Sequence, residues 1–426
     1  MSIMYKTTSE KQRFIKNFLL VIGSVLFVLL FLEGMMRFFV KPSEESYGNL
    51  FGIELPPLKI VQKEMDRNQW FKKLVVKGKK ITVGDLWGYY KEDPTIGYIP
   101  KENMISPNNW WQTNNIGARS KKDTYKHKAP NITRIIVFGE SFTNCSRVSQ
   151  EDTWPNFLEQ KGNNIEVINF GVDGYSMGQS LLRFEAINKQ IQFDMVLLVF
   201  VPTFDLDRDI GVFRWGMVFP RFIIEGEKIK LIKSPYETRT TFYEKNLAGL
   251  SEELNSHLKV YDRFFSPPLY KTQPIIGRLV LYKWLVRKYY NFKTNQLRKH
   301  LMQTDSEAIQ VTKKIIETMN KEVRENGKEI FPIILPVHQD INQYEKNHGY
   351  RVLWNEMSNF ICQNNSNCID LMKDFSVIPQ LQLDTGYDGS HYGPKANQFI
   401  ADLIWKRIKG LTHLALKGEI VFAQFK

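Results

Sequence analysis

Short apolar segments alternate with amphipathic ones over much of the chain. Runs of β-branched and aromatic side chains predict buried strands at Ile135–Phe138, Ile165–Asn169, Met195–Val201, Ile330–Val337 and Cys368–Leu371. Helices are predicted near residues 153–161, 177–190, 304–326, 342–361 and 394–409. Thr304 and Glu307 have the spacing of a capping box at the start of the third of these helices. Strands that alternate with helices predict an α/β fold with a parallel, doubly wound sheet.

An apolar stretch near the amino terminus predicts a membrane anchor. Residues 18–32 carry no charge, and Phe14-Ile15 and Met35 to Val40 can extend the run, although Glu33 and Arg37 follow it. The basic residues that precede it are Lys6, Lys11, Arg13 and Lys16. A cleaved signal peptide is the alternative, but no small-x-small cleavage site follows the run. We therefore expect residues 1–17 in the cytoplasm, a transmembrane anchor at 18–40, and the rest outside the membrane, in the periplasm or at the cell surface.

Two regions depart from the alternating pattern. Residues 41–131 are expected to form an amino-terminal extension, and residues 208–303 an inserted cap. The α/β domain would then consist of residues 132–207 and 304–426. Within the cap, Leu279–Lys288 is either a basic amphipathic helix on a membrane surface or a packed helix.

The overall charge narrows the class of partner. The chain carries a net charge of +13 and is 43% hydrophobic, which is typical of a globular protein with a basic surface. Such a surface is either simply solvated or suited to a polyanion such as anionic lipid or an acidic polysaccharide. Because no recognition motif accompanies the charge, we expect no nucleic-acid partner. The oligomeric state stays open.

Candidate chemistry lies at the predicted carboxyl ends of the strands. Ser141 follows the first predicted strand after a tight Gly139-Glu140 turn, so its side chain would lie at the edge where α/β sheets bind ligands. Asp388 and His391 lie close enough in sequence for the carboxylate to hold one ring nitrogen. The other ring nitrogen is then free to act as base on a hydroxyl, as in a Ser-His-Asp triad.

These motifs resemble a known family. Gly139-Glu140-Ser141-Phe142, then Asn169 to Gly174, then Asp388-x-x-His391, are similar in order and composition to the blocks of the SGNH (GDSL-like) hydrolases. The resemblance covers about residues 132–205 and 305–410 and, with the anchor, implies a membrane-anchored member. It implies a three-layer α/β/α fold with a flavodoxin-like parallel sheet, the SGNH hydrolase fold.

The resemblance also implies roles for single residues. Ser141 would be the nucleophile, His391 the base and Asp388 the residue that orients it. The oxyanion would be bound by the N–H groups of Ser141 and Gly174. The residues that would contact substrate are Glu140, Asp205, Asn115 and Arg119. For Asn115–Arg119, a turn held by an Arg clamp is the alternative. No cofactor and no metal site are expected.

One residue departs from the family pattern. Phe204 stands where the family has an Asn that helps to bind the oxyanion, although Thr203 offers a hydroxyl beside it. Loss of one oxyanion donor costs about 10²–10³ in rate. The implied function is that of an esterase or O-acyl transferase acting on acyl esters. O-acetyl groups of a cell-surface polysaccharide are the leading substrate, and lipid esters are the second candidate. A catalytically impaired protein that binds or assembles envelope polysaccharide is the alternative.

The cysteines leave one question open. Cys362 and Cys368 flank a polar loop that a disulfide could close in an oxidising compartment, and two free thiols are the alternative. Cys145 lies near Ser141 without metal-ligand spacing and is expected to be a packing residue.

Overall fold

The computed structural model describes residues 2–60, 75–76, 79–80, 89–106, 109–271, 273–377 and 383–416. Part of the predicted 41–131 extension therefore lies outside the described residues. The chain forms two compact units. The first comprises Met1–Gln62, Tyr243–Lys259 and Phe264–Gln296, and the second comprises Lys63–Phe242, Val260–Arg263 and Leu297–Lys426. The regions 41–131 and 208–303 are each divided between the two units.

A five-stranded parallel sheet forms the core of the second unit, in the order β15-β14-β9-β7-β8. Its strands are β7 (Thr133–Phe138), β8 (Ile165–Asn169), β9 (Met195–Phe200), β14 (Glu329–Ile334) and β15 (Ile369–Asp370). Every residue of β7 and β9 is buried, as expected for central strands covered on both faces. This is the flavodoxin-like strand order. The order in which successive strands are added to the sheet reverses between β7 and β9, and in such folds ligands bind at the carboxyl ends of the strands at this point.

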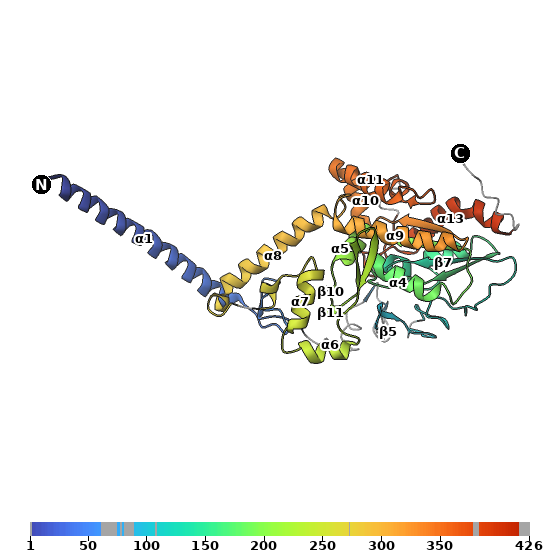
Figure 1. Cartoon of the computed structure of the whole chain (residues 1–426), viewed down its shortest axis with the longest axis horizontal. Coiled ribbons are helices and arrows are strands. Elements are labelled where there is room, and N and C mark those ends of the chain that lie inside the picture. Colours follow the sequence, from blue (N-terminus) through green and yellow to red (C-terminus); the bar gives the residue numbers. More distant parts are fainter. Residues whose placement is uncertain are drawn as a thin grey trace. The chain divides into compact units, whose positions relative to one another are not determined.

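Helices cover both faces of the sheet (Figure 1). On one face, α3 (Trp154–Glu159) packs on α13 (Pro394–Leu416), and these helices contact β8 and β7 respectively. On the other, α4 (Met177–Ile187) packs on α9 (Glu307–Glu325), and these contact β7 and β14. Right-handed crossovers from a sheet of this order place the helices on these two faces. The predicted three-layer α/β/α fold is confirmed.

The structure corrects two of the helix predictions. The capping box at Thr304 is wrong, because α9 begins at Glu307 and Ser306 is its cap, accepting the N–H of Ile309 at 3.2 Å. Glu307 forms ion pairs with Arg221 and Arg263 instead. The single helix expected near 342–361 is two helices, α10 (His338–Lys346) and α11 (His348–Cys362).

The remaining elements of the second unit are short. They are β3 (Val75–Val76), β4 (Lys79–Lys80), β5 (Tyr90–Asp93), β6 (Gly97–Pro100), α2 (Ser141–Asn144), α5 (Pro202–Ile210), β10 (Phe213–Arg214), β11 (Met217–Val218), β12 (Arg221–Glu225), β13 (Lys228–Ile232) and α12 (Met372–Ser376). Cys362 and Cys368 form a disulfide, which settles the question that the sequence left open.

The first unit contains the predicted anchor. Helix α1 (Ser2–Phe39) includes Gln12–Phe39, which is long and apolar enough to cross a membrane. The other elements wholly within this unit are β1 (Gly48–Leu50), β2 (Ile53–Leu55), η1 (Pro267–Leu269) and η2 (Ile276–Arg278). The helices that begin or end outside it are α6 (Arg239–Asn246), α7 (Glu252–Tyr261) and α8 (Val280–His300). Its core packs Leu50, Leu55 and Val280 against Met36 and Val40 of the α1 region.

Candidate active site

Ser141 lies where the central strand β7 ends and the short helix α2 begins. Glu140 is the cap of this helix, and its carboxylate accepts the N–H of Phe142 at 2.7 Å. A side chain at Gly139 would collide with Thr143 across the turn, so the turn requires glycine there. The local sequence thus fixes the Ser141 side chain at the carboxyl edge of the sheet.

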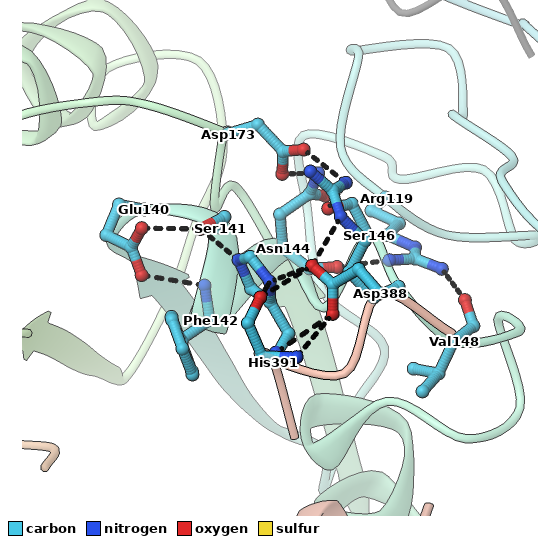
Figure 2. A network of polar contacts seen from close by, with 12 residues as sticks. Arg119, Glu140, Ser141, Phe142, Asn144, Ser146, Val148, Asp173, Asp388 and His391 are labelled. Carbon is cyan, nitrogen blue, oxygen red and sulfur yellow. Dashed lines mark hydrogen bonds and ion pairs between the residues drawn. The ribbon is translucent and has the colours of Figure 1, made fainter. Parts of the chain in front are cut away.

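Ser141, His391 and Asp388 form a hydrogen-bonded chain (Figure 2). The Oγ of Ser141 is 2.8 Å from Nε2 of His391, and Nδ1 of His391 is 2.6 Å from Oδ2 of Asp388. The Nδ1–H of the ring therefore donates a hydrogen bond to the carboxylate, which leaves Nε2 of the neutral ring as an acceptor facing the hydroxyl. This is the geometry in which an imidazole can remove the proton of a serine.

The carboxylate of Asp388 is fixed and ionised. Besides the His391 ring, it accepts the backbone N–H groups of Ser390 and His391, both at 3.0 Å. Burial opposes its ionisation, but the hydrogen bonds from the His391 ring and backbone and from Ser390 outweigh burial and hold the Asp388 pKa well below its ordinary value. Asp388 thus keeps the negative charge that stabilises a protonated His391.

Aromatic rings support the imidazole from one side. The His391 ring stacks on Phe142 with centroids 4.5 Å apart, and Phe142 stacks on Phe204 at 5.9 Å. The Arg208 guanidinium lies 5.2 Å from the centroid of the Phe204 ring. Phe204 therefore packs beside the turn that carries Ser141. The π faces of Phe204 and Phe142 attract neighbouring cations.

Glu140 touches the nucleophile as well as capping its helix. Ser141 Oγ donates to Glu140 Oε2 at 2.6 Å, and Arg208 Nη1 lies 3.2 Å from the same oxygen. Figure 2 shows Glu140 and Asp388 at opposite ends of this group of side chains. The hydroxyl of Ser141 consequently has two acceptors, a buried carboxylate and an imidazole, and it can donate to only one at a time.

Arg147 joins the triad to the neighbouring turn. Its Nε donates to Asp388 at 3.2 Å and its Nη1 to Asp173 at 3.1 Å. The other oxygen of Asp173 accepts from the Asn144 amide at 2.8 Å. Neither Arg147 nor Asp173 was predicted from the sequence as a site residue, because neither contact follows from spacing along the chain.

Gly174 lies in the turn after β8 with a φ of +75°, a conformation that favours glycine. A side chain there would collide with the indole of Trp215, so the turn and the Trp215 ring are in close contact. Among the described residues, the N–H groups of Ser141 and Gly174 have no hydrogen-bond partner. Two backbone donors at this edge are what a developing oxyanion requires.

The Thr203 hydroxyl is used elsewhere, since it donates to Asp340 at 2.5 Å. Asp205 is also turned inward. It is buried and accepts the N–H of Val201 at 2.7 Å. Burial first, and then the nearby Glu140 carboxylate, raise the Asp205 pKa well above its ordinary value.

Arg119 is a buried clamp on the segment that follows the nucleophile. Its guanidinium donates to the carbonyl oxygens of Asn144 and Val148. Asn115 bonds through its side chain to the backbone of Thr124 at 2.9 and 3.0 Å. The structure thus brings Arg119 to the nucleophile loop through backbone contacts, and it holds Asn115 in a separate turn.

Cys145 lies near Ser141 in sequence, but its thiol is not activated. Cys145 is buried, and burial raises the pKa of its thiol to about 12, which disfavours a reactive thiolate. In the part of the chain that the structure describes, no group of three or more His, Cys, Asp or Glu could hold a metal ion.

Comparisons with known proteins give distant likenesses. No family model and no curated protein matches the chain. Among solved structures, a lipase/acylhydrolase from Enterococcus faecalis is similar at 13% identity over 66% of this chain and 97% of that chain, with a TM-score of 0.34. A psychrotrophic esterase from Pseudoalteromonas sp. is similar at 13% identity over 66% and 99%, with a TM-score of 0.33. An acetyl xylan esterase is similar at 13% identity over 64% and 98%, also with a TM-score of 0.33. Likeness at this level assigns neither family nor activity to this chain.

Proposed function

We propose that this protein is a membrane-anchored serine esterase or O-acyl transferase of the SGNH type. The observation that carries the proposal is the chain from Ser141 Oγ through His391 to Asp388, with both contacts at hydrogen-bond distance. It lies at the carboxyl edge of a flavodoxin-like sheet, where such folds bind ligands.

The reaction has two covalent steps. Ser141 Oγ attacks the ester carbonyl while His391 takes its proton, and the oxyanion is bound by the N–H groups of Ser141 and Gly174. His391 then gives the proton to the leaving alcohol, which leaves an acyl-serine. Water or an acceptor hydroxyl, deprotonated by His391, then attacks the acyl-serine, and His391 returns that proton to Ser141 Oγ as the acyl group leaves. Asp388 fixes the ring and stabilises the imidazolium in both steps.

The substrate class follows from the motif resemblance and the anchor. O-acetyl groups on a cell-surface polysaccharide are the leading substrate, and acyl esters of lipids come second. Helix α1 supports this by its length and apolar composition, which would hold the site near such substrates.

A second function is a catalytically impaired protein that binds or assembles envelope polysaccharide. Two observations favour it. Phe204 stands in place of an oxyanion donor, and the Glu140 carboxylate holds the Ser141 hydroxyl at 2.6 Å, in competition with His391.

Esterase assays on an acetyl ester such as p-nitrophenyl acetate separate the two functions. Ser141→Ala and His391→Ala should each lower kcat roughly 10³-fold or more, and the double variant should be no worse than either, since the residues act as one unit. Ser376→Ala, at a half-buried position in the last turn of α12, is the matched control and should leave kcat unchanged. Undiminished turnover in Ser141→Ala would exclude it as nucleophile, and an inactive wild type would favour the binding protein.

A further inference from the structure

Exposed apolar side chains gather where α1 ends in the first unit. Phe38 lies in its last turn and is 83% exposed. Phe51, at the tip of the β1–β2 hairpin, is 76% exposed, and Ile275, in the turn before η2, is 83% exposed. Ile276 beside it is half-exposed. We call these four residues the apolar collar; single exposed apolar residues are ordinary, but four at one helix end are not.

The collar is held in place by contacts with α1 itself. The Glu33 carboxylate accepts the N–H groups of Val280 and Leu281, the first residues of α8, both at 2.9 Å. Arg37 pairs with Glu33 at 2.7 Å and donates to the carbonyl oxygen of Arg278 at 3.1 Å. The turn that carries Ile275 is therefore fixed to the last turns of α1.

The β1–β2 hairpin is fixed to the same helix end. The rings of Phe39 and Phe51 are 5.4 Å apart. Leu50 and Leu55 of the hairpin are buried in the small core that includes Met36. The hairpin tip and the η2 turn thus flank the end of α1 as a packed assembly.

Exposed basic residues lie close in sequence to three of the four collar residues. Lys41, Lys271 and Arg278 are all exposed, and no acidic residue occurs between Phe264 and Thr304. Of the nearby basic side chains, Lys283 is buried, with its ammonium 4.0 Å from the centroid of the Tyr47 ring. The exposed positive charge is thus next to the apolar tips, a pattern typical of membrane-interface segments.

We propose that the apolar collar inserts into the bilayer interface where α1 leaves the membrane, and that Lys41, Lys271 and Arg278 bind acidic lipid headgroups there. The occupant of this surface is the membrane, because the collar continues the lipid-facing surface of α1. The inference rests on the proposed anchor and goes beyond it: the first unit contacts the bilayer surface itself, in addition to carrying the membrane-spanning helix. Juxtamembrane basic residues are attracted to acidic lipid in this way.

Single-cysteine labelling of the full chain tests the collar. Cys145 is buried and Cys362 and Cys368 form a disulfide, so a thiol reagent will label an introduced exposed cysteine selectively. Phe51→Cys and Ile275→Cys carry an environment-sensitive nitrobenzoxadiazole probe, and Leu247→Cys, which is 48% exposed, is the matched control. Each protein is reconstituted in phosphatidylcholine vesicles with or without phosphatidylglycerol, and a nitroxide quencher is attached to the lipid.

We expect the lipid-borne quencher to remove most of the emission at positions 51 and 275 and none at 247. Quenching should be stronger with phosphatidylglycerol, and equal quenching in both vesicles would overturn the acidic-lipid part. Flotation of the vesicles in high salt reports the anchor separately. A chain that floats while all three probes stay unquenched would overturn the collar alone. A chain that fails to float would overturn the anchor and the collar together, while the esterase assays would still test the active site.

Discussion

The hydroxyl of Ser141 is the residue-scale feature on which activity depends. His391 Nε2 at 2.8 Å can take its proton, but Glu140 Oε2 at 2.6 Å competes for it in the resting state. For attack, the hydroxyl has to turn from the carboxylate to the imidazole. A hydrogen bond to a charged group contributes about 1.5–3 kcal/mol, so this competition would slow the proposed reaction without excluding it.

The sequence predicted some of these residues and not others. That Ser141, Asp388 and His391 lie together could be expected, because they belong to short motifs, a strand-ending turn and an Asp-x-x-His loop, whose order resembles that of a known family. Arg147 and Asp173 could not, because their contacts with Asp388 and Asn144 join segments distant in sequence. The same reason applies to Thr203, whose partner Asp340 lies in another helix.

Phe204→Asn tests the missing oxyanion donor. The Phe204 ring is a wall that stacks on Phe142, so an amide in its place would put a donor near the nucleophile. We expect roughly a tenfold or greater rise in kcat on an acetyl ester, since one well-placed donor is worth about 10²–10³ in rate. Phe204→Leu, which also removes the ring but adds no donor, is the control. If the Asn variant is no faster than the Leu variant, the backbone donors already complete the hole.

At the scale of elements, the central strands were the most predictable part of the fold. Segments such as Val196–Phe200 are buried on both faces and are therefore apolar throughout. Such a continuous apolar run can be read from the sequence without knowledge of the residues that pack on it. The caps were less predictable. Thr304 and Ser306 are both good cap residues, but Ser306 is the cap, and Glu307 pairs with Arg221 of a distant hairpin. Neighbouring charges of this kind cannot be deduced from local sequence.

Asp209, in the helix layer, allows a prediction of how stability depends on pH. This buried residue of α5 accepts the N–H of Gly178 in α4 at 3.1 Å and the hydroxyl of Thr312 in α9 at 2.7 Å. Burial raises its pKa from 3.8 to about 6. The folded state then binds the proton more tightly than the unfolded state. The stabilisation of the folded state by protonation of Asp209 is therefore fully present below pH 4. It is lost as the pH rises through 6.

The neutral variant Asp209→Asn lacks this titration. A shift of roughly two pH units corresponds to about 3 kcal/mol, so the stability of the wild type relative to the variant should fall by up to that amount between pH 4 and pH 7. Denaturant unfolding of both full-length proteins in detergent at each pH measures the difference. Parallel pH profiles would mean that Asp209 does not titrate in this range.

At the scale of the whole molecule, orientation in the membrane decides which substrates the site can meet. The basic residues before the apolar run favour a cytoplasmic amino terminus. Alkaline phosphatase, which is active only outside the cytoplasm, should therefore be active when fused after Lys426. Replacing Lys6, Lys11, Arg13 and Lys16 by Gln should lower that activity by weakening the orientation signal. An inactive phosphatase on a stably expressed fusion would place the site in the cytoplasm and exclude a cell-surface substrate.

The central claim is that Ser141 is a nucleophile activated by His391. Its most direct test is labelling of the full-length protein with a fluorophosphonate, followed by peptide mass spectrometry to locate the adduct. The geometry predicts one adduct, on Ser141, formed rapidly in the wild type and strongly slowed in His391→Ala, because the hydroxyl then lacks the imidazole that activates it. An adduct on another residue, or a Ser141 that stays unlabelled in folded wild-type protein, would contradict the claim.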